Sequence, residues 1–476
     1  MYSKRYTHRR RDTNTPPSYT AAAPRPRSAF PRTFLSPLMS VATDLHVASS
    51  GATLPPPYSS GQWVTAWHAS PQGPFPIGNN ALQPPLDRAM PGCVSCDQAF
   101  RMVLPLSLPH VSSPQLRFRF SNALGSTPLC LADVSTARHA ASSHIDAASQ
   151  QRLTFGGKDT LLLEPGVECA SDGVALPWLP AFGGSVCVTF VVRGRCDRIT
   201  WHAKAMTTSY VAPPGSGRPP PEAGDDFFVF SCTSWFFLCG IDVWSTRGDQ
   251  VVAVLGDSIA DGTNSTINGC DKWPDILSRF VNRQGQDQQP RAFTHVVNCG
   301  IGGNSICHPP PQHPAPAHRG GVAAATRMLQ EVLRLHGLTC CIWSQGINDF
   351  SSNTGASSAT VISSVVAAVA EARLLAPRVK FIACTVASAL GSTCGGHGGA
   401  EQDAERRAFN RWLLDGDAPF DHVIDFDAVS VLRQLLLSSS AHAPQLSCRC
   451  QSHRLPAAHL PCHRQAPARI RLQHIG

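Results

Sequence analysis

The sequence predicts a β-sandwich-like domain over residues 61–246, followed by an α/β domain over residues 247–433. In the first range, short strand-like runs are divided by Gly and Pro turns and helical periodicity is nearly absent, which is typical of a β-sandwich. After Gly248, apolar strand-length runs alternate with helix-length segments, which indicates a parallel sheet covered on both faces. A chain of 476 residues is long enough for two or three domains.

Both ends of the chain lack these patterns. Residues 1–60 are rich in Arg, Ser and Pro and contain no compact apolar segment of the kind found in secretory signals. We expect a disordered arm there, in preference to a transit peptide. Residues 434–476 mix Cys, His, Arg and Pro with no periodicity of either kind, so we expect an irregular tail. Neither end identifies a cellular compartment.

The net charge of +8 belongs to the two ends. Residues 1–32 carry eight Lys and Arg against Asp12 alone, a charge of +7, and residues 428–476 carry six Arg and no acid, a charge of +6. These two segments leave a charge of −5 for the region between them. A mildly acidic folded region argues against a nucleic-acid partner.

Apolar stretches and cysteines exclude two further classes. The longest uncharged apolar stretch, from Phe227 to Ile241, is interrupted by hydroxyl side chains and is too short to span a membrane, so we expect two aromatic-rich strands there. The 18 cysteines are scattered, and Cys93 with Cys96 forms a lone CxxC pair. A loop thiol pair or a disulfide is a better interpretation of that pair than a metal site.

The expected elements follow from periodicity. In the first domain the strand-like runs are Phe100–Leu108, Gln115–Ser121, Ser185–Arg193 and Phe227–Phe230. In the second, the expected strands are Val251–Leu255, His295–Asn298, Thr339–Trp343, Val379–Thr385 and His422–Asp425. The expected helices between them are Trp273–Asn282, Val322–His336, Val361–Leu375 and Ala400–Leu414.

Three loops follow three consecutive expected strands of the second domain. The first loop contains Gly256-Asp257-Ser258, the second runs from Asn298 to Ser305, and the third is Gly346-Ile347-Asn348-Asp349. In open α/β sheets, ligands bind beyond the carboxyl ends of the strands, so all three loops should lie at one sheet edge. The spacing of 45 residues from Ser258 to Gly303, and again from Gly303 to Asn348, fits one strand–helix–strand repeat.

The residue types in these loops suit acyl transfer. Ser258 offers a hydroxyl nucleophile, and a developing oxyanion needs hydrogen-bond donors nearby. Gly303 has no side chain, so its N–H can approach a substrate closely, and the carboxamide of Asn348 offers a further donor. Each motif alone is more often a turn or a helix cap, and it is their order, spacing and placement that favour a site.

Together the motifs resemble those of the SGNH, or GDSL, hydrolase superfamily. Gly256-Asp257-Ser258 is similar to its first block, residues 300–305 to its second and residues 346–349 to its third. Further stretches, among them Trp273-Pro274-Asp275 and Trp201-His202, resemble a subgroup of esterases that carry an N-terminal β domain and are often secreted. The resemblance covers residues 62–432.

This resemblance implies a flavodoxin-like three-layer α/β/α domain and metal-independent ester hydrolysis without a cofactor. Ser258 would be the nucleophile, and Gly303 and Asn348 would complete the oxyanion hole. The substrate would be a small acyl ester, with acetylated carbohydrates suggested by the subgroup. A lipase that acts at membranes is less well supported, because no amphipathic surface helix is evident.

The family's fourth block, Asp-x-x-His, is missing from the sequence. Its His would be the general base and its Asp would orient that His. The last acidic residue is Asp427, and no His stands three positions after an Asp in this region. The tail contains His442, His453, His459, His463 and His474, which we expect to be solvated. A frameshift, a splice form or a gene-model error would explain the loss of pattern, and a catalytically inactive ligand-binding homologue is the alternative to an impaired esterase.

Overall fold

The computed structural model describes residues 61–78, 86–108, 114–178, 184–283, 292–307, 320–393 and 396–430. They all belong to one compact unit, Pro55–Gly476. The expected arm and the expected tail lie outside the described residues. The five tail histidines lie outside them too.

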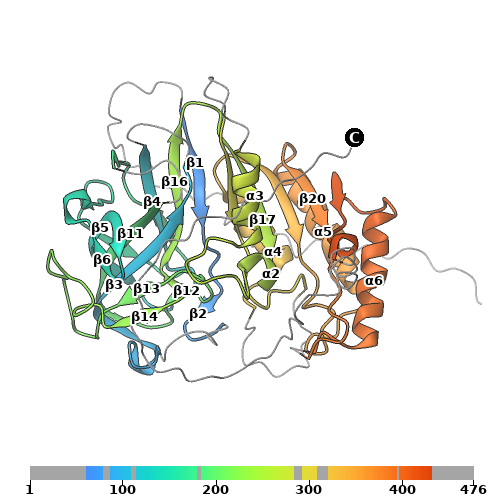
Figure 1. Ribbon diagram of the computed structural model, residues 1–476, viewed down its shortest axis with the longest axis horizontal. Helices are drawn as coiled ribbons and strands as arrows, with labels where there is room; N and C mark the ends of the chain where they lie inside the picture. Colours follow the sequence, from blue (N-terminus) through green and yellow to red (C-terminus); the bar gives the residue numbers. More distant parts are fainter. Residues whose placement is uncertain are drawn as a thin grey trace, which may run out of the picture. The chain divides into compact units, whose positions relative to one another are not determined.

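The N-terminal half is rich in strands that pair antiparallel (Figure 1). One sheet has the order β1 (Gln62–His68), β16 (Leu238–Ser245), β4 (Gln115–Ser121) and β10 (Val174–Ala175), with β9 (Glu168–Ala170) beside β4. The eight-stranded sheet has the order β14 (Phe230–Cys232), β13 (Ser209–Val211), β3 (Ser95–Leu106), β11 (Gly184–Cys196), β5 (Leu129–Ala141) and β6 (His144–Ile145), with β7 (Gln151–Arg152) and β8 (Thr160–Leu163) also on β5. A small sheet joins β15 (Trp235–Phe236), β12 (Thr200–His202) and β2 (Gly73–Pro74).

Aromatic rings from the first two sheets meet in one core. Phe120 of β4 lies 5.7 Å, between ring centres, from Phe190 of β11, and Phe190 stacks on Phe100 of β3 at 5.5 Å. All three side chains are fully buried, and such ring pairs contribute about 0.5–1.5 kcal/mol beyond their area burial. This packing supports the β-sandwich-like arrangement that the alternating sequence of β4 predicts.

The expected strand Phe227–Phe230 is wrong over most of its length. Residues 225–227 form a turn, in which the N–H groups of Phe227 and Phe228 both donate to Gly224 O, and the strand begins only at Phe230. The stretch to Ile241 contains three strands rather than two. Ser234 lies between β14 and β15, and its hydroxyl donates to Ala203 O at 2.7 Å. Cys93 and Cys96 are free thiols.

The C-terminal half has one parallel sheet. Its order is β18 (Thr294–Asn298), β17 (Gln250–Gly256), β19 (Leu338–Ser344), β20 (Lys380–Cys384) and β21 (His422–Ile424). The helices are α2 (Ser258–Asp261), α3 (Trp273–Val281), α4 (Ala324–Gln330), α5 (Ser358–Leu375) and α6 (Ala400–Leu414). All five expected strands and four expected helices are confirmed. The helix expected over 322–336 is shorter, because Glu331 leaves helical geometry and its carboxylate accepts hydrogen bonds from His68 and Ser70 of the strand-rich half.

Alternate residues of β17 enter two different apolar clusters. Ala253 and Leu255 pack with the buried residues of α4, α5 and α6, whereas Val254 packs in a cluster with Trp273 and Leu277 of α3. A strand with apolar neighbours on both faces reads as a continuous apolar run, which explains its sequence. The mixed α/β prediction is confirmed, and this packing supports the predicted three-layer arrangement.

Helix α5 is apolar and long enough, by length and composition alone, to cross a membrane. No membrane-spanning segment was expected from the sequence. One such helix is weak evidence, because the core helices of soluble proteins pass the same test. The buried residues Val361, Val365, Ala368, Val369 and Ala372 follow helical spacing and join the core beneath the sheet.

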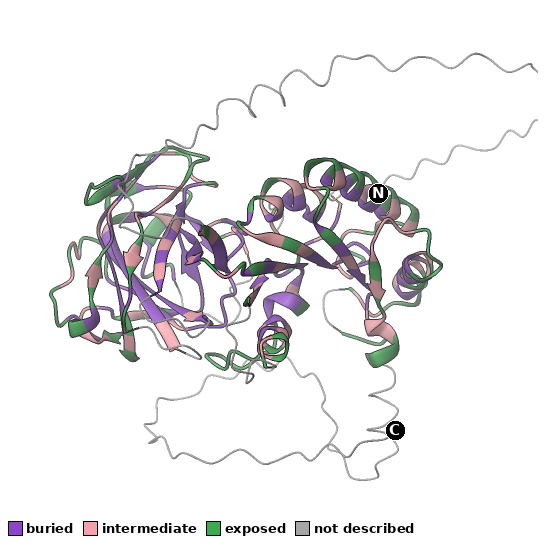
Figure 2. Cartoon of the chain, turned by 90° about the horizontal axis from the view of Figure 1, so that it is seen from above, coloured by how far each residue is buried: buried purple, intermediate pink, exposed green. Residues whose placement is uncertain are grey.

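The two halves share one hydrophobic core, so that buried residues run continuously from one to the other (Figure 2). A buried carboxylate lies where they join. Asp242 of β16 accepts from Thr65 of β1 and Arg117 of β4, both at 2.9 Å, and His336 Nδ1 lies 3.4 Å away. Burial opposes its ionisation, but Arg119, His336 and Arg117 outweigh that effect and hold the pKa of Asp242 well below its usual value. The predicted domain boundary at residue 246 stays a prediction.

Asp242→Asn should lower the free energy of unfolding by about 3 kcal/mol, because it leaves the buried Arg119 without its counter-charge. Chemical denaturation followed by circular dichroism measures this loss. The matched control is Asp197→Asn, which removes the exposed pair with Arg195 and should cost less than about 1 kcal/mol. Equal losses in the two variants would contradict the structural role of Asp242.

Candidate active site

The first loop places Ser258 at the end of β17. Gly256 allows the sharp turn, because a Cβ there would stand 2.2 Å from the Cβ of Ala260. The side chain of Asp257 then caps α2 by accepting from the N–H of Ile259 at 2.9 Å. Ser258 is half-buried and begins the short helix, so it lies at the carboxyl end of a central strand, as predicted.

The second loop lies directly against the first. The N–H of Ile301 donates to Gly256 O at 3.1 Å, and the side chain of Asn298 donates to Ala260 O at 2.6 Å. The N–H of Gly302 donates to the Asp261 carboxylate at 2.8 Å. Gly303 has a φ of +81°, which favours glycine, so the backbone turns here in a way other residues rarely allow.

The third loop holds the far end of the second. The Asp349 carboxylate accepts from the N–H groups of Ile306 and Cys307 at 2.9–3.0 Å. The carboxamide of Asn348 donates to Asn304 O at 2.8 Å. A carboxamide has two N–H donors, so one of them is available to another acceptor. Hydrogen bonds therefore join the loops of all three predicted residues, Ser258, Gly303 and Asn348.

The residues that hold the second loop were not predicted from the sequence. Asp261 and Asp349 clamp its two ends, and Asn304 fixes its middle through bonds from Arg327 and Gln345 at 2.8 and 2.9 Å. A signal was present, because Asp261 stands one helical turn after Ser258 and Asp349 directly follows the third motif. Their roles depend on contacts across the sheet edge that spacing alone does not specify.

The strand-rich half contributes polar side chains to the same edge. His202 Nε2 lies 3.1 Å from the Asp261 carboxylate, and Gln72 donates to Gly302 O at 3.0 Å. Lys204 is 95% buried and donates to Thr263 at 3.0 Å. Burial acts to raise the pKa of Asp261, but His202, Lys272 and Lys204 outweigh it and lower that pKa, so the carboxylate stays ionised.

Two other carboxyl groups near Ser258 have raised pKa values. Burial raises the pKa of Asp257 to about 7, and the negative charges of Asp349 and Asp261 add to the rise. Burial likewise raises the pKa of Asp349 to about 6, against the opposing N–H groups of Cys307 and Ile306. Perturbed carboxyl groups that cluster at a strand end are typical of functional sites.

Two histidines lie close to these loops. His202 uses both ring nitrogens, since Nδ1 lies 2.9 Å from Ser70 O and Nε2 contacts Asp261. His397, in the segment between β20 and α6, hydrogen-bonds the backbone of Ile347 in the third loop. Its Nδ1 is buried with no hydrogen-bond partner among the described residues, and burial lowers its pKa, so the ring is neutral at pH 7. Asp427, the last acidic residue of the sequence, accepts a hydrogen bond from the guanidinium of Arg406 at 2.6 Å.

His68, Cys299 and Glu331 bring possible metal-ligand atoms within 4.8 Å of one another. The residues fit a metal poorly. Arg327 contacts the Glu331 carboxylate at 3.1 Å, and burial holds the pKa of Cys299 well above its usual value, which disfavours the thiolate that metals bind. The group is better explained as a polar contact between the two halves.

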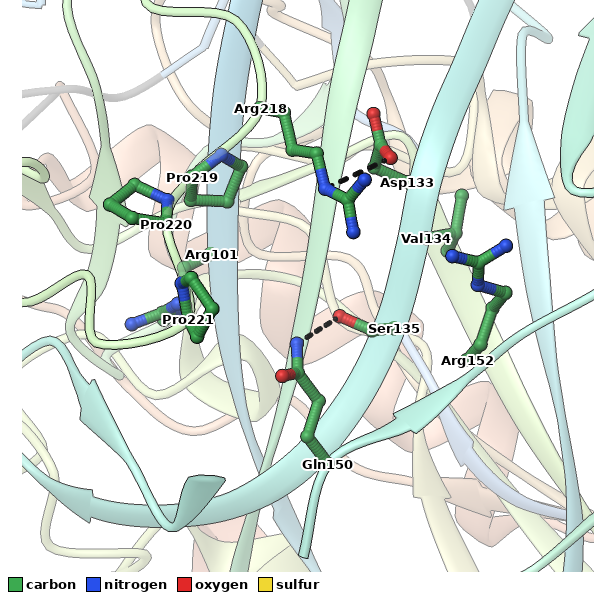
Figure 3. Close-up of a pocket in the computed structure, with 10 residues that line it drawn as sticks. All are labelled: Arg101, Asp133, Val134, Ser135, Gln150, Arg152, Arg218, Pro219, Pro220 and Pro221. Atoms are coloured by element: carbon green, nitrogen blue, oxygen red, sulfur yellow. Dashed lines mark hydrogen bonds and ion pairs between the residues drawn. The ribbon is translucent and has the colours of Figure 1, made fainter. Parts of the chain in front are cut away.

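The larger described cavity lies elsewhere, in the strand-rich half. Its volume is about 520 Å³, and Ser258, Gly303 and Asn348 are not among its lining residues (Figure 3). A cavity of about 60 Å³ beside Asp261 is lined by His202 and Lys272. The chemistry of the three loops, rather than cavity size, therefore identifies the candidate site.

Asp257→Asn should change how stability depends on pH. Because the folded protein holds the pKa of Asp257 at about 7 rather than 3.8, unfolding at intermediate pH releases a proton, and stability falls as pH rises from 4 to 7. Asn keeps the cap but cannot ionise. The melting temperature of the variant minus that of the wild type should therefore increase over this range, as scanning calorimetry would measure. A difference that stays constant with pH would contradict the raised pKa.

Residues 254–445 match the GDSL-like Lipase/Acylhydrolase family, and the match runs past residue 433, the predicted end of the α/β domain. No curated protein matches the chain significantly. Among solved structures, a putative arylesterase from Agrobacterium tumefaciens str. C58 is 21% identical, with a TM-score of 0.29 over 38% of this chain and 85% of that one. A carbohydrate acetylesterase family member from Sinorhizobium meliloti is 19% identical, with a TM-score of 0.28 over 38% and 84%.

A family two carbohydrate esterase from Clostridium thermocellum, in complex with cellohexaose, is 11% identical, with a TM-score of 0.27 over 70% of this chain and 83% of that one. TM-scores this low do not establish a shared fold, so the family match and the three joined loops carry the assignment. The match of residues 254–445 to the GDSL-like Lipase/Acylhydrolase family confirms the resemblance that the three motifs predicted.

Proposed function

We propose that this protein is a serine esterase that hydrolyses small acyl esters, with acetylated carbohydrates as one substrate class. The single observation that supports this most strongly is the hydrogen-bonded joining of the three loops that carry Ser258, Gly303 and Asn348. The family match supports ester hydrolysis. The carbohydrate substrate rests on the sequence resemblance alone.

In this proposal Ser258 Oγ attacks the ester carbonyl carbon, and the carbonyl oxygen becomes an oxyanion. The backbone N–H of Gly303 and the second N–H of Asn348 donate to that oxygen, and each such donor is worth about 3–4 kcal/mol of transition-state stabilisation. The alcohol then leaves, and water hydrolyses the acyl-enzyme. No cofactor takes part in these steps.

The proton of Ser258 needs an acceptor, since the Asp-x-x-His block is missing. We propose His397 for this role, because its ring lies against the third loop and is neutral at pH 7. Within the described part of the chain, His397 has no buried carboxylate partner of the kind that orients the base in a triad, so the rate should be well below that of a complete triad. If His397 accepts the proton of Ser258, the variant His397→Gln should have a lower kcat than the wild type.

Ser258→Ala should abolish the hydrolysis of p-nitrophenyl acetate by the full chain, because the variant lacks the hydroxyl that attacks the ester in this proposal. Initial rates measured by absorbance test this. Ser265→Ala, seven residues further along the same segment, is the matched control and should keep the wild-type rate. Rates that are equal for the wild type and Ser258→Ala would overturn the esterase proposal.

Asp261→Asn should lower kcat about tenfold with little change in KM, because a carboxamide cannot accept from both Gly302 and His202 and the oxyanion loop would shift. Steady-state kinetics with p-nitrophenyl acetate measure this, with the exposed Asp271→Asn as control. An unchanged kcat would show that the clamp does not position the loop.

The alternative function is a catalytically inactive ligand-binding homologue, which the missing fourth block favours. It would hold an ester in the same loops without cleaving it. Saturable binding of a non-hydrolysable phosphonate ester, with no rate that depends on Ser258, would support this alternative.

A further inference from the structure

The cavity of about 520 Å³ lies over the eight-stranded sheet, far in sequence from the three loops of the proposed active site. Residues 133–135 of β5 form one wall, Gln150 and Arg152 the second, and residues 218–221 the third. Figure 3 shows the side chains of Arg218 and Arg152 entering from opposite sides, with Gln150 below them. The mechanism proposed above uses none of these residues.

Positive charge dominates this cavity. Arg218 lies 3.4 Å from Asp133, which Arg193 also contacts at 2.8 Å, and Arg152 lies 2.7 Å from Asp159. The side chains of Arg218 and Arg152 are 66% and 54% exposed, so most of their N–H donors remain open to a ligand. Arg218, Arg152 and Arg193 thus share the carboxylates of Asp133 and Asp159. Arg193 and Asp159 are not among the residues that line the cavity.

A fourth arginine adds an uncompensated charge. Arg101 is only 1% exposed, and it donates to Thr189 Oγ1, Ser143 O and Ala223 O, which are all neutral acceptors. No ion pair of Arg101 occurs within the described ranges of the chain. Burial lowers its pKa to about 10, which still leaves it charged at pH 7. A buried cation without an anion is costly, and an anionic ligand nearby would offset that cost.

The other lining groups suit the rest of a ligand. A guanidinium binds a carboxylate through two parallel hydrogen bonds, which a lysine does not do. Ser135 Oγ and the carboxamide of Gln150, joined at 3.0 Å, can exchange hydrogen bonds with hydroxyl groups. Pro219, Pro220 and Pro221 offer a rigid apolar wall without N–H donors.

We propose that this cavity binds a sugar acid, with its carboxylate held by Arg218 and Arg152 and its hydroxyls by Gln150 and Ser135. The ligand site is separate from the proposed esterase site. Either proposal can therefore fail without the other.

Calorimetric titration of the full chain at low salt tests this with three probes: trigalacturonate, neutral cellotriose and citrate. Trigalacturonate should bind at least tenfold more tightly than the other two, because it alone carries both a carboxylate and sugar hydroxyls. The double variant R152A/R218A should lose at least tenfold in affinity for it. The control Arg195→Ala removes another exposed, paired arginine of the strand-rich half and should bind as the wild type does.

Absent binding of trigalacturonate, or equal binding of cellotriose, would overturn the proposal. Citrate binding as tightly would overturn it too, since a carboxylate alone would then suffice. Arg218→Lys keeps the charge but not the paired donors, and it is a milder change that does not depend on folding of the double variant. The affinity of Arg218→Lys for trigalacturonate should fall between those of the wild type and the double variant. Wild-type affinity in both Arg218→Lys and R152A/R218A would contradict the proposed site.

Discussion

The carboxylate of Asp261 is the contact on which the candidate active site depends. One of its oxygens accepts from the N–H of Gly302 in the second loop, and the other faces His202 from the strand-rich half. It follows Ser258 by one helical turn, so a single buried group connects the helix of Ser258, the second loop and the strand-rich half. Burial alone would neutralise it, and the surrounding cations keep it charged. Without this charge the N–H of Gly302 would lose its carboxylate acceptor, and Asp349 would be the remaining carboxylate that holds the second loop.

The strand-rich half therefore contributes side chains to the candidate active site. Gln72, His202 and Lys204 all approach loops that follow strands of the parallel sheet. The buried Asp242 of β16 and the shared apolar core also join the two halves. Buried polar networks of this kind rigidify a structure when every member is satisfied. Rigid loops are what an oxyanion hole requires, because its donors act best when they need no reorganisation.

Much of the α/β half could be predicted from the sequence. The apolar run before Gly256 identified β17, and the even spacing of the three motifs identified loops at one sheet edge. Helix α6 was predicted to the residue, because its apolar positions follow helical spacing between a glycine and a turn. The prediction for residues 227–230 was wrong because four apolar residues in a row do not distinguish a strand from a turn packed under Arg101. The end of α4 was not predicted because Glu331 is held by His68 and Ser70, which precede it by 263 and 261 residues.

The sequence by itself predicted the three motifs that contain Ser258, Gly303 and Asn348 and the parallel sheet that orders them, since both predictions depend on local pattern. Only the tertiary structure decided which groups hold the three loops in place and which cations keep Asp261 ionised. His202 and Lys204 are distant in sequence from Asp261 and Thr263, and these residues meet only because the two halves pack against each other. The same holds for the arginine-lined cavity, whose residues come from four separate segments. Long-range electrostatics depends on distance in space, and periodicity carries no information about it.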